Sequence, residues 1–203
     1  SRRIFICAEP LGSTCTIVYQ QFIRNNRTPD PVTAKVLLTG LISDTLILKS
    51  PTTTGDDSVA AHVLASICRT DLEEYGISMF SRLEGLKERE PKAAIVSDFK
   101  TYAENGLKIG IGQCEVTTLN DLKDYADDYS QALEEVRSMQ GLSWAVLMIT
   151  DVIHEHSALI CTDHRGNRHL PYKSIGKNIF DMPHVMSRKK QLLPEIIQSM
   201  EEH

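Results

Sequence analysis

The chain has 203 residues, of which 41% are hydrophobic and 24% are charged, and its formal net charge is -5. These values are typical of a globular protein with one large core or two smaller ones. The acidic balance argues against a partner that is a nucleic acid or an anionic membrane surface, because proteins that bind them carry a basic face. No apolar run reaches the roughly 18 residues that span a bilayer. Residues 1–7 do not form a signal peptide, so we expect a cytoplasmic protein.

The beginning of the chain predicts a strand, a turn and a helix in that order. Residues 3–8 predict the strand, and glycine with two hydroxyl residues at 12–14 predicts a capped turn. Ile17, Val18 and Phe22 then recur near helical spacing. The order indicates an α/β fold.

Three further helices are predicted before residue 87. Asp30 and Pro31 are a cap and a first helical proline, and residues 32–49 predict a nearly all-apolar helix that ends at Lys49-Ser50-Pro51. Residues 54–57 predict the cap of the next helix, and a third begins near Asp71. The residues that we expect the second of these helices to bury are Val59, Val63, Leu64 and Ile67.

The polar segment 87–92 interrupts the helical pattern and predicts a domain boundary. Beyond it the periodicity changes to that of strands, and a long amphipathic helix lies between them. Strands are expected at 94–102, 107–116, 144–149 and 158–161, and helices at 118–139 and from about Pro194. Five widely spaced cysteines without a C-x-x-C pair predict neither a disulfide framework nor a structural zinc site.

Asp44 is the first candidate functional residue. It interrupts an apolar helix, and a carboxylate there must be hydrogen-bonded, neutralised or bound to a cation to offset its desolvation. Two interpretations stay open on spacing alone. Asp44 either ligates a metal ion or lies with Ser43 on a narrow exposed polar face of the helix.

Residues 187–190 (SRKK) form the second candidate, a basic cluster in an acidic chain. Arginine matches phosphoryl oxygens with a planar fork and lysine adds a point charge, so the cluster predicts a phosphate site; a solvated turn is the alternative. His154 and His156, with Asp151, Asp163 and His164 nearby, suggest a metal cluster. Their position in an expected hairpin favours ordinary polar loop side chains instead.

Four segments in this order resemble family II inorganic pyrophosphatases of the DHH phosphoesterase superfamily. They are residues 9–14 (EPLGST), 41–54 (LISDTLILKSPTTT), 71–76 (DLEEYG) and 187–191 (SRKKQ) followed by Pro194. The resemblance covers nearly the whole chain. It implies that residues 1–85 are the C-terminal part of a DHH domain, a mostly helical remainder, and that residues 91–203 are a DHH-associated substrate-binding domain with a mixed sheet.

The resemblance also implies roles for individual residues. Asp44 falls on an aspartate that ligates the manganese cluster, and Lys100, Ser187, Arg188 and Lys189 fall on substrate-binding positions, of which Lys100, Arg188 and Lys189 would act in catalysis. The implied reaction is hydrolysis of pyrophosphate to two phosphates by a hydroxide that bridges Mn²⁺ or Co²⁺ ions, with Mg²⁺ on the substrate. The implied partners are pyrophosphate and a second copy of the chain, with adenine nucleotides as regulators through domains that this chain lacks.

The chain departs from the family's pattern in one respect. The family's other metal-ligand motifs, including Asp-His-His, do not occur in it. We therefore expect a C-terminal portion of a longer polypeptide, inactive by itself. The alternatives are a phosphoesterase that acts on polyphosphate or nucleotides and a non-catalytic module that binds phosphate or regulates.

Overall fold

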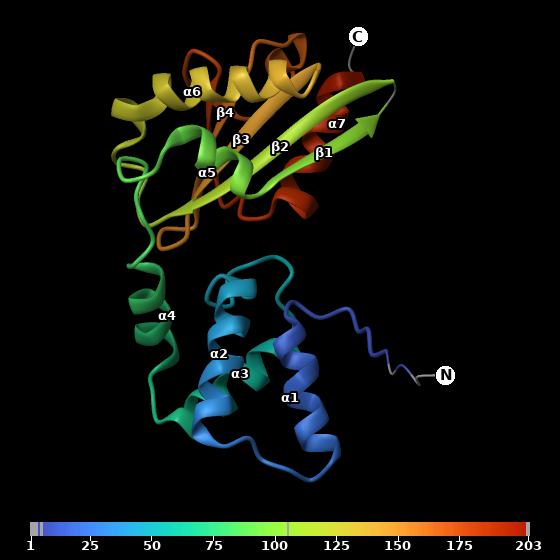
Figure 1. The fold of residues 1–203 in the computed structure, drawn as a ribbon, viewed down its shortest axis with the longest axis vertical. Helices are drawn as coiled ribbons and strands as arrows, with labels where there is room; N and C mark the ends of the chain where they lie inside the picture. The colour runs from blue at the N-terminus through green and yellow to red at the C-terminus, as the bar shows by residue number, and fades with distance from the viewer. Residues whose placement is uncertain (1–3, 5, 105, 202–203) are drawn as a thin grey trace. The chain divides into compact units, whose positions relative to one another are not determined.

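The computed structural model describes residues 4, 6–104 and 106–201, and they form two units, residues 1–79 and 80–203. Figure 1 shows the helical N-terminal unit in blue and teal and the sheet of the C-terminal unit in green to red. Among the described residues, no helix combines the length and the apolarity that are needed to cross a membrane. The α/β fold class predicted from the sequence is confirmed.

The N-terminal unit packs three helices around a small apolar core. The helices are α1 (Thr14–Arg24), α2 (Pro31–Thr45) and α3 (Gly55–Cys68), and α4 (Leu72–Phe80) follows them. Ser13 and Asp30 cap α1 and α2 as predicted, and Thr54 and Asp57 form a reciprocal capping box on α3. The fully buried side chains at the centre are Leu38, Leu41, Ile42, Ala61 and Leu64.

Helix α2 ends four residues earlier than the sequence predicts. The backbone turns left-handed at Leu46, and Ile47 and Leu48 continue with positive φ angles of 56° and 63°. The side chains of Leu46 and Ile47 are nevertheless buried in this turn. Their apolar character therefore extended the predicted helix past its true end at Thr45.

Two other predictions for this unit are wrong in whole or in part. Ile4 and residues 6–8 form no strand, and Ile4 and Ile6 are exposed, while residues 3 and 5 lie outside the described residues. A strand needs a neighbour for its backbone hydrogen bonds, and the described part of this unit has none. The prediction for helix α3 is confirmed for Leu64, which is buried with Ala60 and Ala61, and wrong for Val59 and Val63, which are exposed. Ile67 is half-buried. The small residues of α3 allow close approach to α2.

The C-terminal unit contains a six-stranded mixed sheet in the order β1-β2-β3-β4-β6-β5. Only β2 and β3 pair in parallel, and helix α6 connects them. The strands are β1 (Phe99–Glu104), β2 (Leu107–Val116), β3 (Trp144–Asp151), β4 (His156–Cys161), β5 (Lys173–Gly176) and β6 (Ile179–Pro183). The helices are α5 (Pro91–Ser97), α6 (Leu122–Met139), a 3-10 turn (Arg165–Arg168), a π-helix (Arg188–Leu192) and α7 (Leu193–Glu201).

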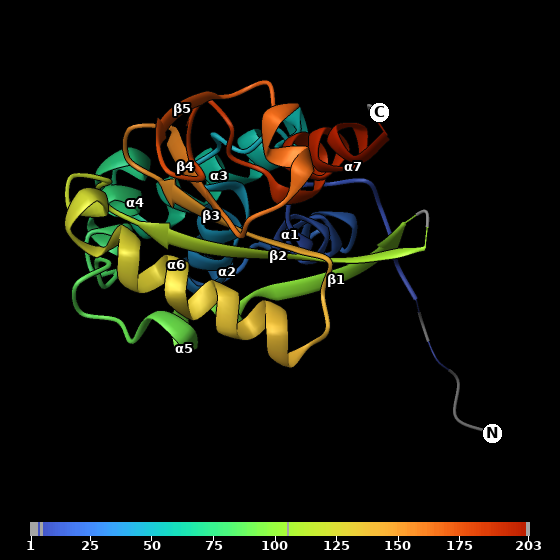
Figure 2. The same cartoon turned by 90° about the horizontal axis from the view of Figure 1, so that it is seen from above.

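Both faces of the sheet are covered, as Figure 2 shows: α5 and α6 lie on one face and α7 on the other. Side chains of β2 and β3 alternate between two cores. Ile95, Tyr129, Leu133 and Leu147 belong to the core under α5 and α6, and Ile111, Trp144, Leu192 and Ile196 belong to the core under α7. This alternation explains why β3, buried along its whole length, appears in the sequence as a continuous apolar run.

Residues 94–97 form the end of α5 and not the start of the predicted strand. The Glu90 carboxylate accepts hydrogen bonds from the Lys92 and Ala93 amides, and Pro91 occupies the first turn. This cap stabilises a short helix although its residues favour strands. The strands β5 and β6 were not predicted.

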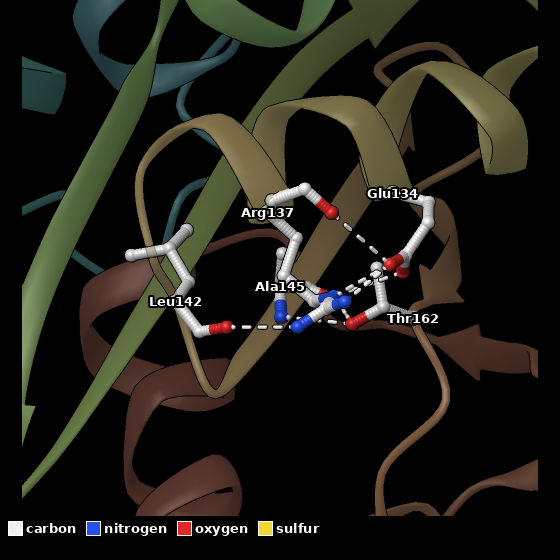
Figure 3. Close-up of polar contacts among 6 residues, drawn as sticks. Glu134, Arg137, Leu142, Ala145 and Thr162 are labelled. Atoms are coloured by element: carbon white, nitrogen blue, oxygen red, sulfur yellow. Dashed lines mark hydrogen bonds and ion pairs between the residues drawn. The ribbon is translucent and has the colours of Figure 1, made fainter.

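Hydrogen bonds connect the end of α6 to the segment before β3, as Figure 3 shows. Arg137 pairs with Glu134 and donates through one NH group to the Leu142 carbonyl at 3.1 Å. The Ala145 amide donates to the Thr162 hydroxyl at 3.0 Å, which joins β3 to the residue after β4. These contacts fix the connection between the long helix and the centre of the sheet.

Candidate functional site

Asp44 lies exposed in the last turn of α2 next to Ser43, which is exposed as well, as the interpretation of a narrow polar face expects. The Ser13 hydroxyl donates a hydrogen bond of 2.6 Å to Asp44 Oδ2. The same hydroxyl oxygen accepts from the Cys15 amide at 3.1 Å as the N-cap of α1. Ser13 therefore both begins a helix and orients the candidate metal ligand. Whether Asp44 ligates a metal stays a prediction.

We predict that Ser13→Ala lowers the free energy of unfolding of the N-terminal unit by about 1 kcal/mol, the usual cost of a lost N-cap. Ser13→Thr keeps the hydroxyl and serves as the control. Urea denaturation followed by far-ultraviolet circular dichroism measures the difference. Equal stability of the alanine variant and the wild type would show that the cap contributes nothing.

Asp57 is the polar centre of the N-terminal unit, and its side chain is fully buried. It accepts hydrogen bonds from the Gly12 and Ser13 amides, from the Thr16 hydroxyl at 2.5 Å, and from both the amide and the hydroxyl of Thr54. Burial alone would raise the pKa of Asp57, but the hydrogen bonds from Thr16 and Thr54 outweigh it and lower the pKa below its ordinary value. Asp57 thus fixes the segment that carries Ser13.

The basic cluster is held by its own backbone and by one glutamine. The side-chain oxygen Oε1 of Gln191 accepts from the Met186 and Ser187 backbone amides at 2.8 and 3.0 Å, and the side-chain Nε2 donates to the His184 backbone carbonyl. Ser187 caps the π-helix that begins at Arg188. Short π-segments occur often at functional sites.

Arg188 and Lys189 differ in their exposure to solvent. Lys189 is exposed, whereas the Arg188 side chain is only 8% exposed. Arg188 donates through NH2 to Asp98 Oδ1 at 2.9 Å and through NH1 to the Asp98 carbonyl at 2.8 Å, with a longer contact to the Ile111 carbonyl at 3.4 Å. Its guanidinium is therefore largely committed to the protein.

These contacts place the Arg188 side chain against the strand pair that carries Lys100. Ile111 on β2 is the register partner of Lys100 on β1, so Arg188 contacts the strand position opposite Lys100. Lys100 is exposed. We call Lys100, Ser187, Arg188 and Lys189 the basic corner. Asp44 belongs to the other unit.

One carboxyl group near the basic corner has a perturbed pKa. Burial raises the pKa of Glu115, and the charge of Asp98 raises it further, against the opposing effect of Arg89 and Arg188. The Arg89 guanidinium donates to the Glu115 carbonyl at 3.0 Å and not to its carboxylate. Glu115 is therefore coupled to the basic corner by charge.

The histidines of the β3–β4 hairpin form two separate pairs with carboxylates. His154 Nδ1 lies 2.8 Å from Asp151 Oδ2, and His156 Nε2 lies 2.6 Å from Asp181 Oδ1. The His164 ring stacks on Trp144 with ring centroids 4.7 Å apart. Over residues 4, 6–104 and 106–201, no group of three or more His, Cys, Asp or Glu residues could hold a metal ion.

Residues 77–199 match the DHHA2 domain family, so the unit that carries the basic corner is a domain of this class. The chain belongs to the family II inorganic pyrophosphatases, as its relatives show.

Two curated relatives carry the name "Probable manganese-dependent inorganic pyrophosphatase". The one from Lactobacillus helveticus is 32% identical over 98% of this chain and 65% of its own length, and the one from Streptococcus agalactiae is 33% identical over 97% and 64%. A Methanococcus jannaschii crystal structure described as a "putative family II inorganic pyrophosphatase" matches with a TM-score of 0.81 at 30% identity, over 98% of this chain and 68% of that one. The chain thus spans about two thirds of the length of these relatives.

Asp98 and Gln191 had no role predicted from the sequence, although both hold the basic corner in place. Gln191 had a local signal, because a side-chain amide four residues after Ser187 can return to the backbone of the same turn. No local sequence pattern could identify the role of Asp98, because its partner Arg188 lies 90 positions further along the chain.

Proposed function

We propose that this chain is the phosphate-binding part of an enzyme that hydrolyses inorganic pyrophosphate to two phosphates with manganese. The observation that carries the proposal is the basic corner: exposed Lys100 is the strand partner of Ile111, whose carbonyl Arg188 contacts, and exposed Lys189 follows Arg188, in a chain of net negative charge. The names of the curated relatives support pyrophosphate as the anion. Because the chain spans about two thirds of those relatives, the activity of the whole enzyme is part of the proposal.

In this proposal the cations act by position and charge. Lys100 and Lys189 are compact charges on flexible stems that contact separate oxygens of the substrate, and Ser187 lies at the start of the same turn. Neutralising the oxygens lowers the barrier to in-line attack and stabilises the phosphate that leaves. Arg188 contributes positive charge from a fixed place.

Asp44 fits one ligand position of a manganese ion, because its carboxylate is exposed and Ser13 holds only Oδ2. A divalent metal of this kind supplies an activated water when bound. Co²⁺ in place of Mn²⁺, and Mg²⁺ with the substrate, belong to the proposal as well. One carboxylate does not hold a pair of ions, so we propose that this segment alone turns over no pyrophosphate.

Three predictions about context belong to the same proposal. They are a homodimer, regulation by adenine nucleotides through domains outside this chain, and a cytoplasmic location. The exposed apolar side chains of the N-terminal unit support burial against another surface; on its helices the largest exposures are those of Val32 at 74%, Val36 at 67% and Val59 at 64%.

We predict that Lys100→Ala and Lys189→Ala each weaken pyrophosphate binding to the chain by roughly tenfold, the usual value of a charge-assisted hydrogen bond to phosphate. Lys173→Ala is the matched control, because Lys173 is exposed on β5 at the opposite edge of the sheet from β1. Titration calorimetry at low salt measures the affinities. Equal effects of the three substitutions would indicate a general charge effect and contradict the site.

A non-catalytic module that binds phosphate is the second candidate function. It is favoured by the lack of a group of three metal-ligating side chains among the described residues. An assay of manganese-dependent phosphate release from pyrophosphate by the full encoded polypeptide distinguishes the enzyme from the module. The module would bind pyrophosphate but would release no phosphate. Faster turnover of tripolyphosphate or a nucleotide in the same assay would favour the third reaction class, a phosphoesterase for longer substrates.

A further inference from the structure

Arg188 occupies an unusual place for a residue of a basic surface turn. Its side chain is 8% exposed, whereas its partner Asp98 is 49% exposed. A guanidinium that leaves water needs hydrogen-bond partners that compensate the loss of hydration. Asp98 supplies two of them, a carboxylate oxygen and its own carbonyl oxygen, and the Ile111 carbonyl supplies a third, longer contact.

The geometry of this contact fixes the guanidinium plane. Both terminal nitrogens of Arg188 donate to the same residue, so rotation about the end of the side chain would break both bonds. The Asp98 carbonyl also accepts from the Gln113 amide at 3.0 Å, which holds it to β2. The three contacts use three of the five N–H groups of an arginine, and two remain for other partners.

We propose that Asp98 is a positioning residue for anion binding at the basic corner. It holds Arg188 so that the remaining N–H groups, Lys100 and Lys189 form one site. Because Ile111 is paired with Lys100, the same contact sets where the turn at 187–190 lies against β1. This inference rests on the proposed function, which supplies the anion.

Simple electrostatics makes the opposite prediction for Asp98. A half-exposed carboxylate beside an anion site repels the anion, so its neutralisation should tighten binding. If Asp98 acts by positioning Arg188, its neutralisation should weaken binding. The sign of the change therefore distinguishes the two roles.

The experiment compares Asp98→Asn and Asp98→Ala with Glu115→Gln in the 203-residue chain. Glu115 is a charge control, since its carboxylate is coupled to Arg188 by charge and no hydrogen bond joins them. Calorimetry with pyrophosphate should show weakening by roughly tenfold in Asp98→Ala, less in Asp98→Asn, and unchanged or tighter binding in Glu115→Gln. Fluorescence of the single Trp144 confirms that each variant is folded.

A second measurement does not depend on pyrophosphate. Nuclear magnetic resonance of the arginine side-chain N–H groups should show a slowly exchanging Arg188 signal that Asp98→Ala abolishes and Glu115→Gln retains. Tighter pyrophosphate binding in Asp98→Ala, or an unchanged Arg188 signal, would overturn the positioning role. Loss of the signal in a chain that does not bind pyrophosphate would support the positioning role and reject the proposed substrate.

Discussion

Replacing Asp57 by alanine is expected to lower the free energy of unfolding of the N-terminal unit by about 3–5 kcal/mol, the cost of breaking a buried charged network. Five hydrogen bonds lose their acceptor, and their donors lie in three segments of the unit: Gly12 and Ser13, Thr16 on α1, and Thr54. Far-ultraviolet circular dichroism should show an earlier transition. Trp144 lies in the C-terminal unit, so its fluorescence transition should not move.

The adjacent Asp56 provides the matched control. It is exposed and accepts one hydrogen bond, from Gln20. Asp56→Ala should change the stability by no more than about 0.5 kcal/mol, the usual range for a surface position. Similar losses in both variants would mean that helix α3 responds to charge at its first turn and not to the Asp57 network.

The stability of the N-terminal unit should also depend on pH through Asp57. Its pKa is lower in the folded chain than the ordinary value of 3.8, so the folded state favours the ionised form. The stabilisation is then fully present above the ordinary pKa and is lost as the pH falls through the lowered pKa of the folded state. Acid titrations of the wild type and Asp57→Asn should differ in this range. Parallel curves would contradict the network.

Gly110→Ala is expected to destabilise the C-terminal unit by about 1–3 kcal/mol or more, because the added methyl overpacks a buried sheet position. A Cβ atom at Gly110 would lie 2.3 Å from Phe99 Cζ and 2.6 Å from Leu142 Cδ1. Phe99 stands between Asp98 and Lys100, so its displacement should also weaken anion binding at the basic corner. Trp144 fluorescence in urea and calorimetry with pyrophosphate measure the two effects.

Gly112, two residues further along β2, is the control for this position. A Cβ atom there would approach Leu147 Cδ1 to 3.1 Å and a Phe99 ring atom to 3.2 Å, which small side-chain movements relieve. Gly112→Ala should therefore cost clearly less than Gly110→Ala. The reverse order would show that Phe99 moves aside easily and does not depend on the absence of a side chain at position 110.

The elements that the sequence predicted well carry their own local signals. Asp30 and Pro31 mark the start of α2 through a side-chain cap and a fixed φ angle. Helix α6 repeats apolar residues on one face over five turns, and strands β2 and β3 are long enough to be distinct. In each case a few neighbouring residues contain the whole physical reason for the structure.

The errors lie where a local preference competes with a contact elsewhere. Residues 94–97 favour strands, but the Glu90 cap begins a helix there. Leu46 and Ile47 are apolar and continue the helical pattern, yet the chain turns left-handed to bury them against the N-terminal unit. The exposed strand β5 has no apolar alternation that could have identified it.

The candidate site likewise combines residues that the sequence identifies locally with contacts between distant residues that it does not. The cluster at 187–190 and Lys100 were identified as separate basic positions, but the contact of Arg188 with Asp98 and Ile111, which places the cluster against β1 and β2, has no local signal. Their separation in the sequence gives no spacing pattern. The exposure of Asp44 likewise depends on where α2 ends, which is set by the packing of the turn after it.

The Arg188–Asp98 contact closes a loop of 90 positions, so the basic corner has a high contact order. Closing a loop of this length costs conformational entropy before the contacts at its ends can form. The basic corner should therefore form late in folding. An anion that binds the corner binds only the completed domain and stabilises it by mass action. If the anion is pyrophosphate, as proposed, its concentration in a cell would influence how long the finished domain persists.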